Sequence, residues 1–477
     1  MAETEGALNL KVRDEADRMA DAIEPGEMLG HAQLMQQVLD QGSLLIPGLG
    51  AFDVSTLFAV GDELFDYAFR PEQGLGNGLG GRTDVRAGRG PAPNLRRVHE
   101  GEFGGPDSHS CSSCHSKGGL DGAGTQTQNA FFRSDGSSTL AADERNPPLV
   151  MGLGPIQALA REMSQDLLDQ ASSSLDEAAA TSIPVAAQLS TKGVSFGSLV
   201  AHPDGTLDVS GLEGVDPDMV VKPFGWKGHQ GSLRRMIEES FRIHMGVLSM
   251  WEQRQVYEGQ RNPADYGNSA SIFDVDEDGT LVEIEDGMLT TMEAYLSQLS
   301  VPVIRPPQDP ILLEYFGRGR LLFEDVQCHR CHVPALELEN SVVELRADLT
   351  PASPVWEINV ATDGETPKIS PILGSQSHRV ELFSDLKRHN MGAELATPVW
   401  QGNIPPSVFL TRPLWGLAET APYLHDGRAP TVHDAIMAHG GESAEAREHY
   451  SDLGVDDQKA LQVFLLSLSR APALGVP

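Results

Sequence analysis

Hydrophobic residues occur along this chain in short runs that glycine and proline repeatedly interrupt. The longest apolar run, Leu44–Phe52, contains both of these residue types and is too short to span a bilayer. The chain has 49 glycines and 31 prolines among its 477 residues. This pattern indicates many turns that join short helices, with little extended sheet, and we predict a mainly α fold.

Composition adds a strongly acidic charge to this picture. Lys and Arg number 35 against 68 Asp and Glu, which gives a net charge of −33. Such a surface repels nucleic acid and anionic lipid and attracts cations and basic proteins, so we expect no nucleic-acid partner. The mean hydropathy of −0.24 argues against a membrane-embedded protein. Met1–Leu10 is acidic and lacks the apolar core of a signal peptide.

All four cysteines lie in two C-x-x-C-H motifs, the attachment signature of c-type haem. Two thiols about one helical turn apart reach the two vinyl groups of a porphyrin, and the adjacent histidine supplies the proximal nitrogen to the iron. A zinc site built from both cysteine pairs would leave the repeated histidine unexplained, and a thioredoxin-type dithiol would lack its strand-to-helix context. The sequence therefore predicts two covalent haems, attached at Cys111, Cys114, His115, Cys328, Cys331 and His332.

Two segments elsewhere in the chain resemble each other and indicate an internal repeat. When Trp226 is aligned with His425, Ser232 coincides with Thr431, and each hydroxyl is a natural helix N-cap. The two predicted helices lead to His244, which is 18 residues after Trp226, and to His439, which is 14 residues after His425. The difference of four residues is about one helical turn. A cytochrome c fold brings a second axial ligand to its haem in this way, so we expect a duplicated cytochrome.

Two further residues compete for the same roles. His229 is the rival of His244 as a ligand of the first haem. Met391 is a conceivable rival of His439 at the second haem, although His439 fits the repeat better.

The order of these motifs resembles the bacterial di-haem cytochrome c peroxidase superfamily. Within it, the chain is most similar to the di-haem oxidoreductase group, whose members are also labelled thiol oxidoreductases. Most of the span from about residue 60 to the C-terminus takes part in the resemblance. The segments that carry it are Cys111–His115, Arg145–Gly154, Phe224–Gly228, Cys328–His332, Asp385–Gly392 and Pro422–Gly441.

The resemblance implies roles for three residues beyond the haem-attachment motifs. His439 would be the second axial ligand of the C-terminal haem, and the resulting pair of imidazoles would lower its potential relative to a Met ligand. Trp226 matches a tryptophan that lies between the haems in this superfamily and would carry electrons or holes. His244 would be either a sixth ligand that moves away or the distal acid/base, and an ordinary helix-face histidine is the third alternative.

These expectations define two domains. Residues 1–300 would form an N-terminal cytochrome c-like haem domain, and residues 301–477 a C-terminal one, both mainly α with long loops. The first domain would end with a calcium loop, because residues 274–285 match an EF-hand loop at every defined position. The predicted oxygen ligands of this hard cation are Asp274, Asp276, Asp278, Thr280 and Glu285.

The function expected from the resemblance is that of a periplasmic di-haem c-type oxidoreductase. Electrons from a small redox protein, either a cytochrome c or a cupredoxin, would reduce hydrogen peroxide at the His115 haem. Two alternatives remain: a haem enzyme that oxidises a protein or an organic substrate, and an electron-transfer cytochrome with two bis-His irons and no substrate. Because c-type haem is attached outside the cytoplasm, we expect an exported protein.

Overall fold

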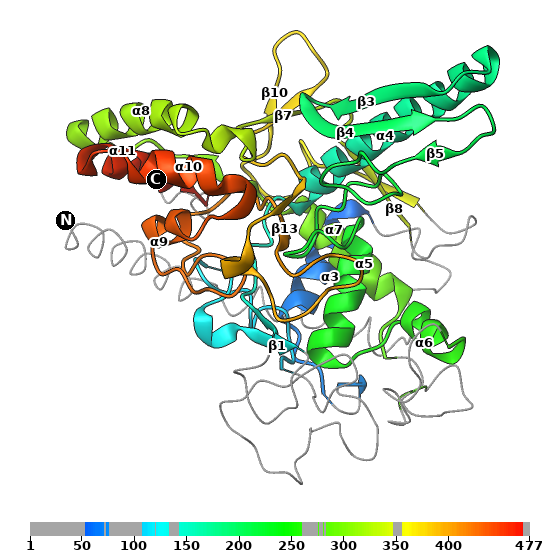
Figure 1. The fold of residues 1–477 in the computed structure, drawn as a ribbon. Coiled ribbons are helices and arrows are strands. Elements are labelled where there is room, and N and C mark those ends of the chain that lie inside the picture. The colour runs from blue at the N-terminus through cyan, green and yellow to red at the C-terminus, as the bar shows by residue number, and fades with distance from the viewer. Residues whose placement is uncertain are drawn as a thin grey trace. The chain divides into compact units, whose positions relative to one another are not determined.

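In the computed structural model, the chain divides into two compact units, and each contains one C-x-x-C-H motif (Figure 1). Unit 1 comprises the residues up to Met151 together with Ile237–Leu296 and Glu344–Glu357. Unit 2 comprises Gly152–Met236, Ser297–Val343 and the residues from Ile358 onward. The structure describes residues 53–70, 73–75, 107–119, 121–132, 143–259, 275, 280, 283–346 and 355–470.

Unit 1 is built mainly from short helices around the first C-x-x-C-H motif. Helix α3 begins after Asp53, whose side chain accepts a hydrogen bond from the Thr56 amide and so caps the helix. A two-stranded antiparallel sheet accompanies the helices, and most of a second antiparallel strand pair, described below, also belongs to this unit. The elements are α3 (Val54–Asp66), η4 (Gln126–Gln128), β1 (Ala130–Phe132), β2 (Asp143–Arg145), the π-helix η5 (Phe241–Met245), α6 (Met250–Tyr257) and most of α7 (Asp286–Gln298).

Unit 2 combines the second C-x-x-C-H motif with a long helix and its hairpin. Helix α4 (Leu153–Thr181) packs against the antiparallel strands β3 (Val185–Thr191) and β4 (Val194–Ala201), to which β5 (Leu207–Asp208) adds a short edge. Helix α5 (Leu233–Ser240) contains the boundary with unit 1. The other helices are α8 (Pro310–Asp325), η7 (Cys328–Arg330), η8 (Ala393–Leu395), α9 (Val432–Met437), η9 (Gly441–Ser443), α10 (Ala444–Ser451) and α11 (Val455–Leu465).

The remaining strands form several small antiparallel sheets. They are β6 (Val303–Ile304) with β14 (Leu468–Ser469), β7 (Leu336–Leu338) with β11 (His378–Val380) and β10 (Ser370–Pro371), β8 (Val342–Arg346) with β9 (Val355–Asn359), and β12 (Arg388–Asn390) with β13 (Val408–Leu410).

The prediction of a mainly α fold is wrong. The described residues are 38% helical and 18% strand, and the strands are distributed over several small sheets. The physical reason is that the glycine-rich turns join short strands as well as short helices. In the longest hairpin, Lys192 and Gly193 both have positive φ, 50° and 81°, as a tight two-residue turn between strands requires.

The aligned repeat segments form two turns of the same design. An isolated antiparallel bridge joins Phe224 to Gln230, and another joins Tyr423 to Ala429 at the aligned positions. Both turns are followed by the predicted hydroxyl caps. Ser232 Oγ accepts from the Arg235 amide at 3.2 Å, and Thr431 Oγ1 accepts from the Asp434 amide at 3.1 Å.

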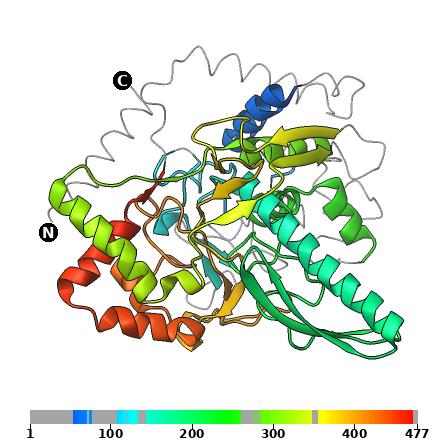
Figure 2. The ribbon, with the colours of Figure 1, turned by 90° about the horizontal axis from the view of Figure 1, so that it is seen from above.

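Each unit also contains a pair of helices that meet at a glycine. A Cβ added to Gly61 of α3 would lie 2.2 Å from the Thr291 carbonyl oxygen of α7. A Cβ added to Gly319 of α8 would lie 1.9 Å from the Ala460 carbonyl oxygen of α11. Helices α8 and α11 lie side by side in both ribbon views (Figures 1 and 2). Glycine is therefore required in both pairs, because only its missing side chain permits this approach.

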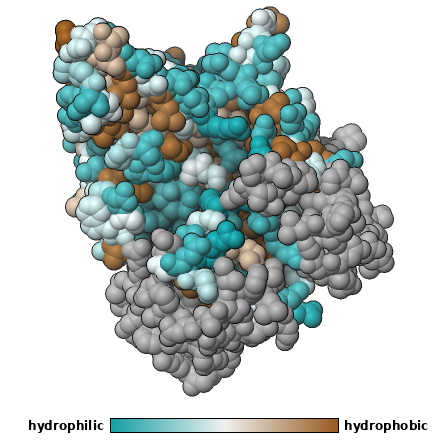
Figure 3. All heavy atoms as spheres, turned by 90° about the vertical axis from the view of Figure 1, so that its right-hand side faces the viewer, coloured by the Kyte–Doolittle hydropathy of each residue, from teal (hydrophilic) through white to brown (hydrophobic). Residues whose placement is uncertain are grey.

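Among the described helices, none is both long enough and apolar enough to cross a membrane. On the face drawn in Figure 3, apolar residues form separate patches among hydrophilic ones. The division into domains at residue 300 stays a prediction.

Two glycines of α8 provide a matched test of the helix packing. We expect Gly319→Ala to destabilise the haem-loaded protein by about 2 kcal/mol or more, because the new methyl group overlaps α11. Gly317→Ala places a methyl group on the same helix where nothing lies within 4 Å, and we expect it to be neutral or to stabilise by ~0.5 kcal/mol. Thermal unfolding of both variants is the measurement. Equal melting temperatures would contradict the close α8–α11 contact.

Candidate haem sites

The first C-x-x-C-H motif is held at the end of α3. The amide of Cys111 donates to the Phe65 carbonyl oxygen at 3.1 Å, and the amides of Cys114 and His115 both donate back to the Cys111 carbonyl oxygen. The His115 Nδ1 lies 2.9 Å from the Pro148 carbonyl oxygen. Because a carbonyl only accepts, Nδ1 carries the proton and Nε2 keeps its lone pair for a metal.

The second motif repeats this arrangement in unit 2. It begins with the single turn η7, and the His332 amide donates to the Cys328 carbonyl oxygen at 3.0 Å. The His332 Nδ1 lies 3.0 Å from the Phe383 carbonyl oxygen, so this imidazole also presents Nε2 as the free donor atom. The segment Arg412–Leu417 shares the residue order Arg, Pro, Leu, Gly, Leu with the segment around Pro148. The acceptor Phe383 nevertheless lies outside Arg412–Leu417.

His439 faces His332. The centroids of the two rings are 6.4 Å apart. The His439 Nδ1 lies 2.7 Å from the Ala435 carbonyl oxygen one turn earlier, which leaves its Nε2 free as well. Burial, followed by the charge of His439, lowers the pKa of His332 to about 4, and burial also lowers the pKa of His439. Both rings are therefore neutral at pH 7, as metal ligands must be.

His244 is the candidate for the corresponding position at the first site. Burial, followed by the charge of His244, lowers the pKa of His115 to about 4. The His244 Nδ1 lies 3.2 Å from Oδ1 of Asp107, whose side chain is fully buried. His244 belongs to the π-helix η5, and the amides of Asp107 and Ser108 donate to its carbonyl oxygen. Wide turns of this kind are common at functional sites.

These donor sets fit six-coordinate c-type haem. Each set has two thiols and two imidazoles, and every Nδ1 is engaged by an oxygen atom. Two metal–nitrogen bonds of about 2 Å each, plus the distance from each nitrogen to its ring centre, give a centroid separation of on the order of 6 Å. The 6.4 Å between His332 and His439 agrees with this value. All four cysteines are free of disulfides and so could form thioethers.

The two sites differ in what holds the distal histidine. The Nδ1 of His439 is bound to a neutral backbone carbonyl. The Nδ1 of His244 is bound to the buried carboxylate of Asp107. A carboxylate can stabilise the positive charge of an imidazole that takes up a proton. The first site is therefore the better equipped for proton transfer.

The rival ligands lie in other settings. The ring of His229 folds back onto Gly225 of its own turn, since a Cβ on Gly225 would lie 2.3 Å from its Cε1. The sulfur of Met391 lies 3.9 Å from Ser443 Oγ, which donates to it. Trp226 lies in unit 2, where the Arg412 guanidinium is 5.5 Å from the indole ring. Its role between the haems stays a prediction.

Most of the predicted calcium loop lies outside the described residues. Asp274, Asp276 and Asp278 belong to this part, whereas Thr280 and Glu285 are described. Two apolar residues of the loop are also described: Val275 is 2% exposed and packs with Leu248 and Val256, and Ile284 forms a bridge with Ser249.

Sequence reasoning missed two polar groups at these sites. No sequence pattern indicated Asp107, because its partner His244 lies 137 residues later in the chain. His389 had a weak signal in its spacing of four residues from Asp385. Its Nε2 lies 2.8 Å from Asp385 and its Nδ1 lies 2.7 Å from Glu442. Both ring nitrogens therefore donate, and this imidazole is a cation.

The model of the family described as "Di-haem oxidoreductase, putative peroxidase" matches residues 201–468, which is more than half of the chain. The chain belongs to this family. The family implies haem cofactors for this di-haem oxidoreductase, in agreement with the resemblance seen in the sequence. Comparison with curated proteins gave no match.

Among solved structures, the di-haem oxidoreductase is similar to a hydrazine synthase of Kuenenia stuttgartiensis that was pressurised with xenon. The sequences are 18% identical, and the match covers 38% of this chain and 55% of the other. The TM-score of 0.23 is too low for this similarity to support an argument.

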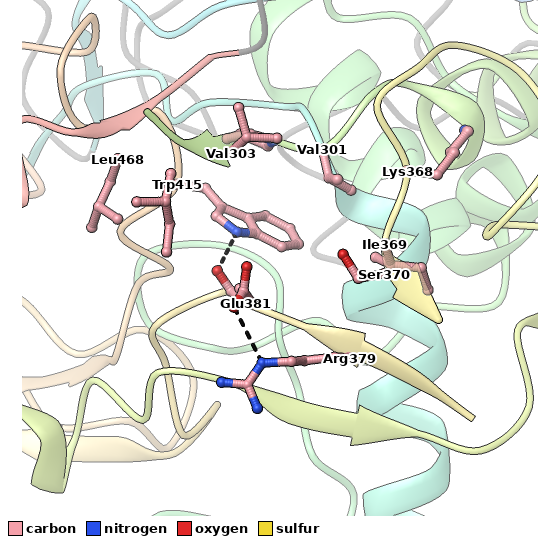
Figure 4. A pocket seen from close by; sticks show the side chains of 11 residues that line it. Val301, Val303, Lys368, Ile369, Ser370, Arg379, Glu381, Trp415 and Leu468 are labelled. Carbon is pink, nitrogen blue, oxygen red and sulfur yellow. Dashed lines mark hydrogen bonds and ion pairs between the residues drawn. The ribbon is translucent and has the colours of Figure 1, made fainter. Parts of the chain in front are cut away.

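A separate pocket lies in unit 2 around Trp415 (Figure 4). The indole Nε1 donates to the Glu381 carbonyl oxygen at 2.6 Å, and Arg379 pairs with the Glu381 carboxylate at 3.1 Å. None of the residues that line this pocket is a cysteine or histidine of the candidate haem sites. The pocket therefore belongs to the framework of unit 2.

The charge on His389 predicts a pH-dependent stability. Burial opposes the charge, but Asp385 raises the pKa of His389 well above its ordinary value. Since that ordinary value is 6.5, the stabilisation is complete below pH 6.5 and is lost as the pH rises through the raised pKa. We expect His389→Gln to cost about 3 kcal/mol at pH 6, as when one partner of a buried ion pair is removed.

Urea unfolding of the haem-loaded protein at pH 6 and pH 10 is the measurement. The difference between wild type and His389→Gln should shrink at the higher pH. His378→Gln is the control, because no carboxylate pairs with His378 in the described part of the chain. A difference that is constant with pH would mean that His389 is neutral.

Proposed function

We propose that the protein is a di-haem peroxidase that reduces hydrogen peroxide with electrons from a small redox protein. The observation that carries this proposal is the asymmetry of the distal histidines. The Nδ1 of His244 is bound to the buried Asp107 carboxylate, whereas the Nδ1 of His439 is bound to a backbone carbonyl. One site is thus equipped for proton transfer, and the other for electron transfer.

The protein groups of the first site have separate tasks. When bound, haem supplies an iron that accepts a peroxide oxygen and passes electrons to it. His115 would hold this iron through Nε2, and its hydrogen bond to the Pro148 carbonyl oxygen fixes the orientation of the ring. His244 would be a second ligand in the resting protein and would move away to admit the substrate. Its place on a π-helix, where the backbone is wider than in an α-helix, favours such a movement.

His244 then acts on protons. Its Nε2 would take a proton from one oxygen of hydrogen peroxide and return it to the other oxygen, which leaves as water. Asp107 stabilises the positive charge that the ring carries between these two steps. The complete reaction consumes two electrons and two protons for each hydrogen peroxide and releases two molecules of water.

The second site would deliver the electrons. The pair His332 and His439 would hold a haem with both axial positions filled, which suits electron transfer without substrate binding. Trp226 would carry electrons onward to the His115 haem. A net charge of −33 favours a basic partner, a cytochrome c or a cupredoxin, and such steering acts mainly on the association rate. Covalent haem attachment implies export to the periplasm.

Substitutions at the distal pair test this function. We expect Asp107→Asn to lower kcat/KM for hydrogen peroxide by about 10- to 100-fold and His244→Ala by about 100-fold or more, because each removes part of the acid/base group. Steady-state turnover with a reduced dye as donor is the measurement. His202→Ala, in the β4–β5 turn, is the control and should turn over as the wild type does.

The same samples distinguish the other functions. An electron paramagnetic resonance spectrum of the half-reduced protein should show a high-spin iron that His244 has released. If both irons stay low-spin and peroxide is not consumed, the protein is an electron-transfer cytochrome. If peroxide oxidises the haem but turnover requires an organic or protein substrate in place of a redox protein, the alternative enzyme function holds.

We also propose that residues 274–285 bind a structural calcium ion. The match of Asp274, Asp276, Asp278, Thr280 and Glu285 to the EF-hand pattern supports this proposal. Removing the ion with a calcium-selective chelator should lower the melting temperature, because a ligand at 100 times its Kd contributes about 2.7 kcal/mol. Calcium but not magnesium should restore the wild-type value. Elemental analysis that finds no calcium, with no change in melting temperature, would exclude the site.

A further inference from the structure

Unit 1 contains a tyrosine whose hydroxyl is enclosed by carboxylates. Tyr295 of α7 is 2% exposed, and its hydroxyl donates to Asp121 Oδ1 at 2.5 Å. Burial, followed by the charges of Asp121 and Asp62, raises the pKa of Tyr295 far above its usual range. The phenol therefore stays protonated, and its proton points at a group that can accept it.

This tyrosine is linked to the proximal histidine of the first haem site by one aromatic ring. The Phe65 centroid lies 5.6 Å from that of Tyr295 and 6.2 Å from that of His115. Phe65 is 3% exposed, so the path from the phenol to the haem ligand runs through packed protein. Close packing of this kind supports electron transfer, because no gap of solvent separates the three rings.

The internal repeat shows that the hydroxyl is not needed for packing. In unit 2 the glycine contact of α8 with α11 places Phe464 where unit 1 has Tyr295, since the Cβ atoms of these two residues face Gly319 and Gly61. The neighbouring ring is also kept, because Phe323 lies 5.5 Å from Phe464.

The second pair of helices has no carboxylate at the position equivalent to Asp62. The position that follows the glycine is Asp62 in unit 1 and Arg320 in unit 2. Of these two equivalent helix pairs, the one with a phenol and carboxylate partners belongs to the unit that also has the carboxylate-bound distal histidine. The equivalent helices α8 and α11 pack together without a tyrosine hydroxyl or a carboxylate at these positions. The presence of these groups in unit 1 therefore indicates a chemical role.

We propose that Tyr295 is a redox-active tyrosine that donates one electron to the His115 haem after peroxide has oxidised it. The O–H bond of Tyr295 breaks, its electron goes to the haem, and its proton moves to Asp121 Oδ1. The products are a neutral tyrosyl radical and a protonated Asp121, and an electron from the redox partner reverses both changes. The proposal rests on the proposed peroxidase function.

The carboxylate is what makes this step feasible in a buried site. Removing an electron alone would leave a cationic phenol in a low-dielectric interior, which is costly. Movement of the proton to Asp121 keeps the phenol neutral and cancels a negative charge that was itself buried, since Asp121 is 8% exposed. Tyr67 of the same unit lacks this partner, because its oxygen accepts a hydrogen bond from the Gln73 amide at 2.6 Å.

Freeze-quench electron paramagnetic resonance of the haem-loaded protein after mixing with hydrogen peroxide tests the proposal. The wild type should give an organic-radical signal that narrows when tyrosine is ring-deuterated. Tyr295→Phe should abolish it. Asp121→Asn should lower its yield by about tenfold or more, because a positioned base contributes on the order of 100-fold or more to proton transfer. Tyr67→Phe should leave the signal unchanged.

Two controls separate folding and function from the proposal. Phe is the residue of the second unit at the equivalent position, and Asn tolerates the positive φ of Asp121, 57°, so both variants should keep the resting haem spectrum. Wild-type protein that consumes peroxide without a Tyr295 radical would overturn the proposal and leave the peroxidase function intact.

If the wild type does not consume peroxide, the proposed function fails, and a photogenerated ruthenium(III) complex replaces peroxide as a one-electron oxidant. A radical that requires both Tyr295 and Asp121 would then support the tyrosine as a redox site. Its absence with this oxidant as well would overturn it.

Discussion

The hydrogen bond from each proximal histidine to a backbone carbonyl is the constraint on which the two sites depend. His115 donates to Pro148 and His332 to Phe383, and in both cases the bond fixes the tautomer and the direction of Nε2. The distal histidine can only be useful if it lies on that line. In the second site, the turn, cap and helix that precede His439 bring its ring to face His332, with the ring centroids 6.4 Å apart.

Duplication supplied two similar frameworks, and the differences between them carry the chemistry. Both halves keep a glycine where two helices cross, and both keep the paired turn before the distal helix. Several polar side chains near the two sites differ. A carboxylate faces the distal histidine of the first site, where the second has a backbone carbonyl. The two frameworks differ in the same way at Tyr295. This residue has a carboxylate partner in unit 1, whereas unit 2 has Phe464 at the equivalent position.

The sequence was a poor guide to the strands. Short hairpins such as β3–β4 depend on pairing between residues that the chain brings together through a two-residue turn, and their local signal is weak. The Lys192-Gly193 dipeptide between β-branched residues was the one available sign. Glycine-rich composition indicated turns correctly but not whether each turn joined helices or strands, which is why the expected mainly α fold was wrong.

The sequence by itself determined the number of haem motifs, the repeat, the helix caps and the family, because each rests on residue types at fixed short spacings. The tertiary structure decided which side chains meet across long separations. Asp107 and His244 are 137 residues apart, and Asp121 and Tyr295 are 174 apart. Such contacts depend on how distant helices pack, and no local pattern records that packing. The partners that hold and move protons could therefore be found only in the folded chain.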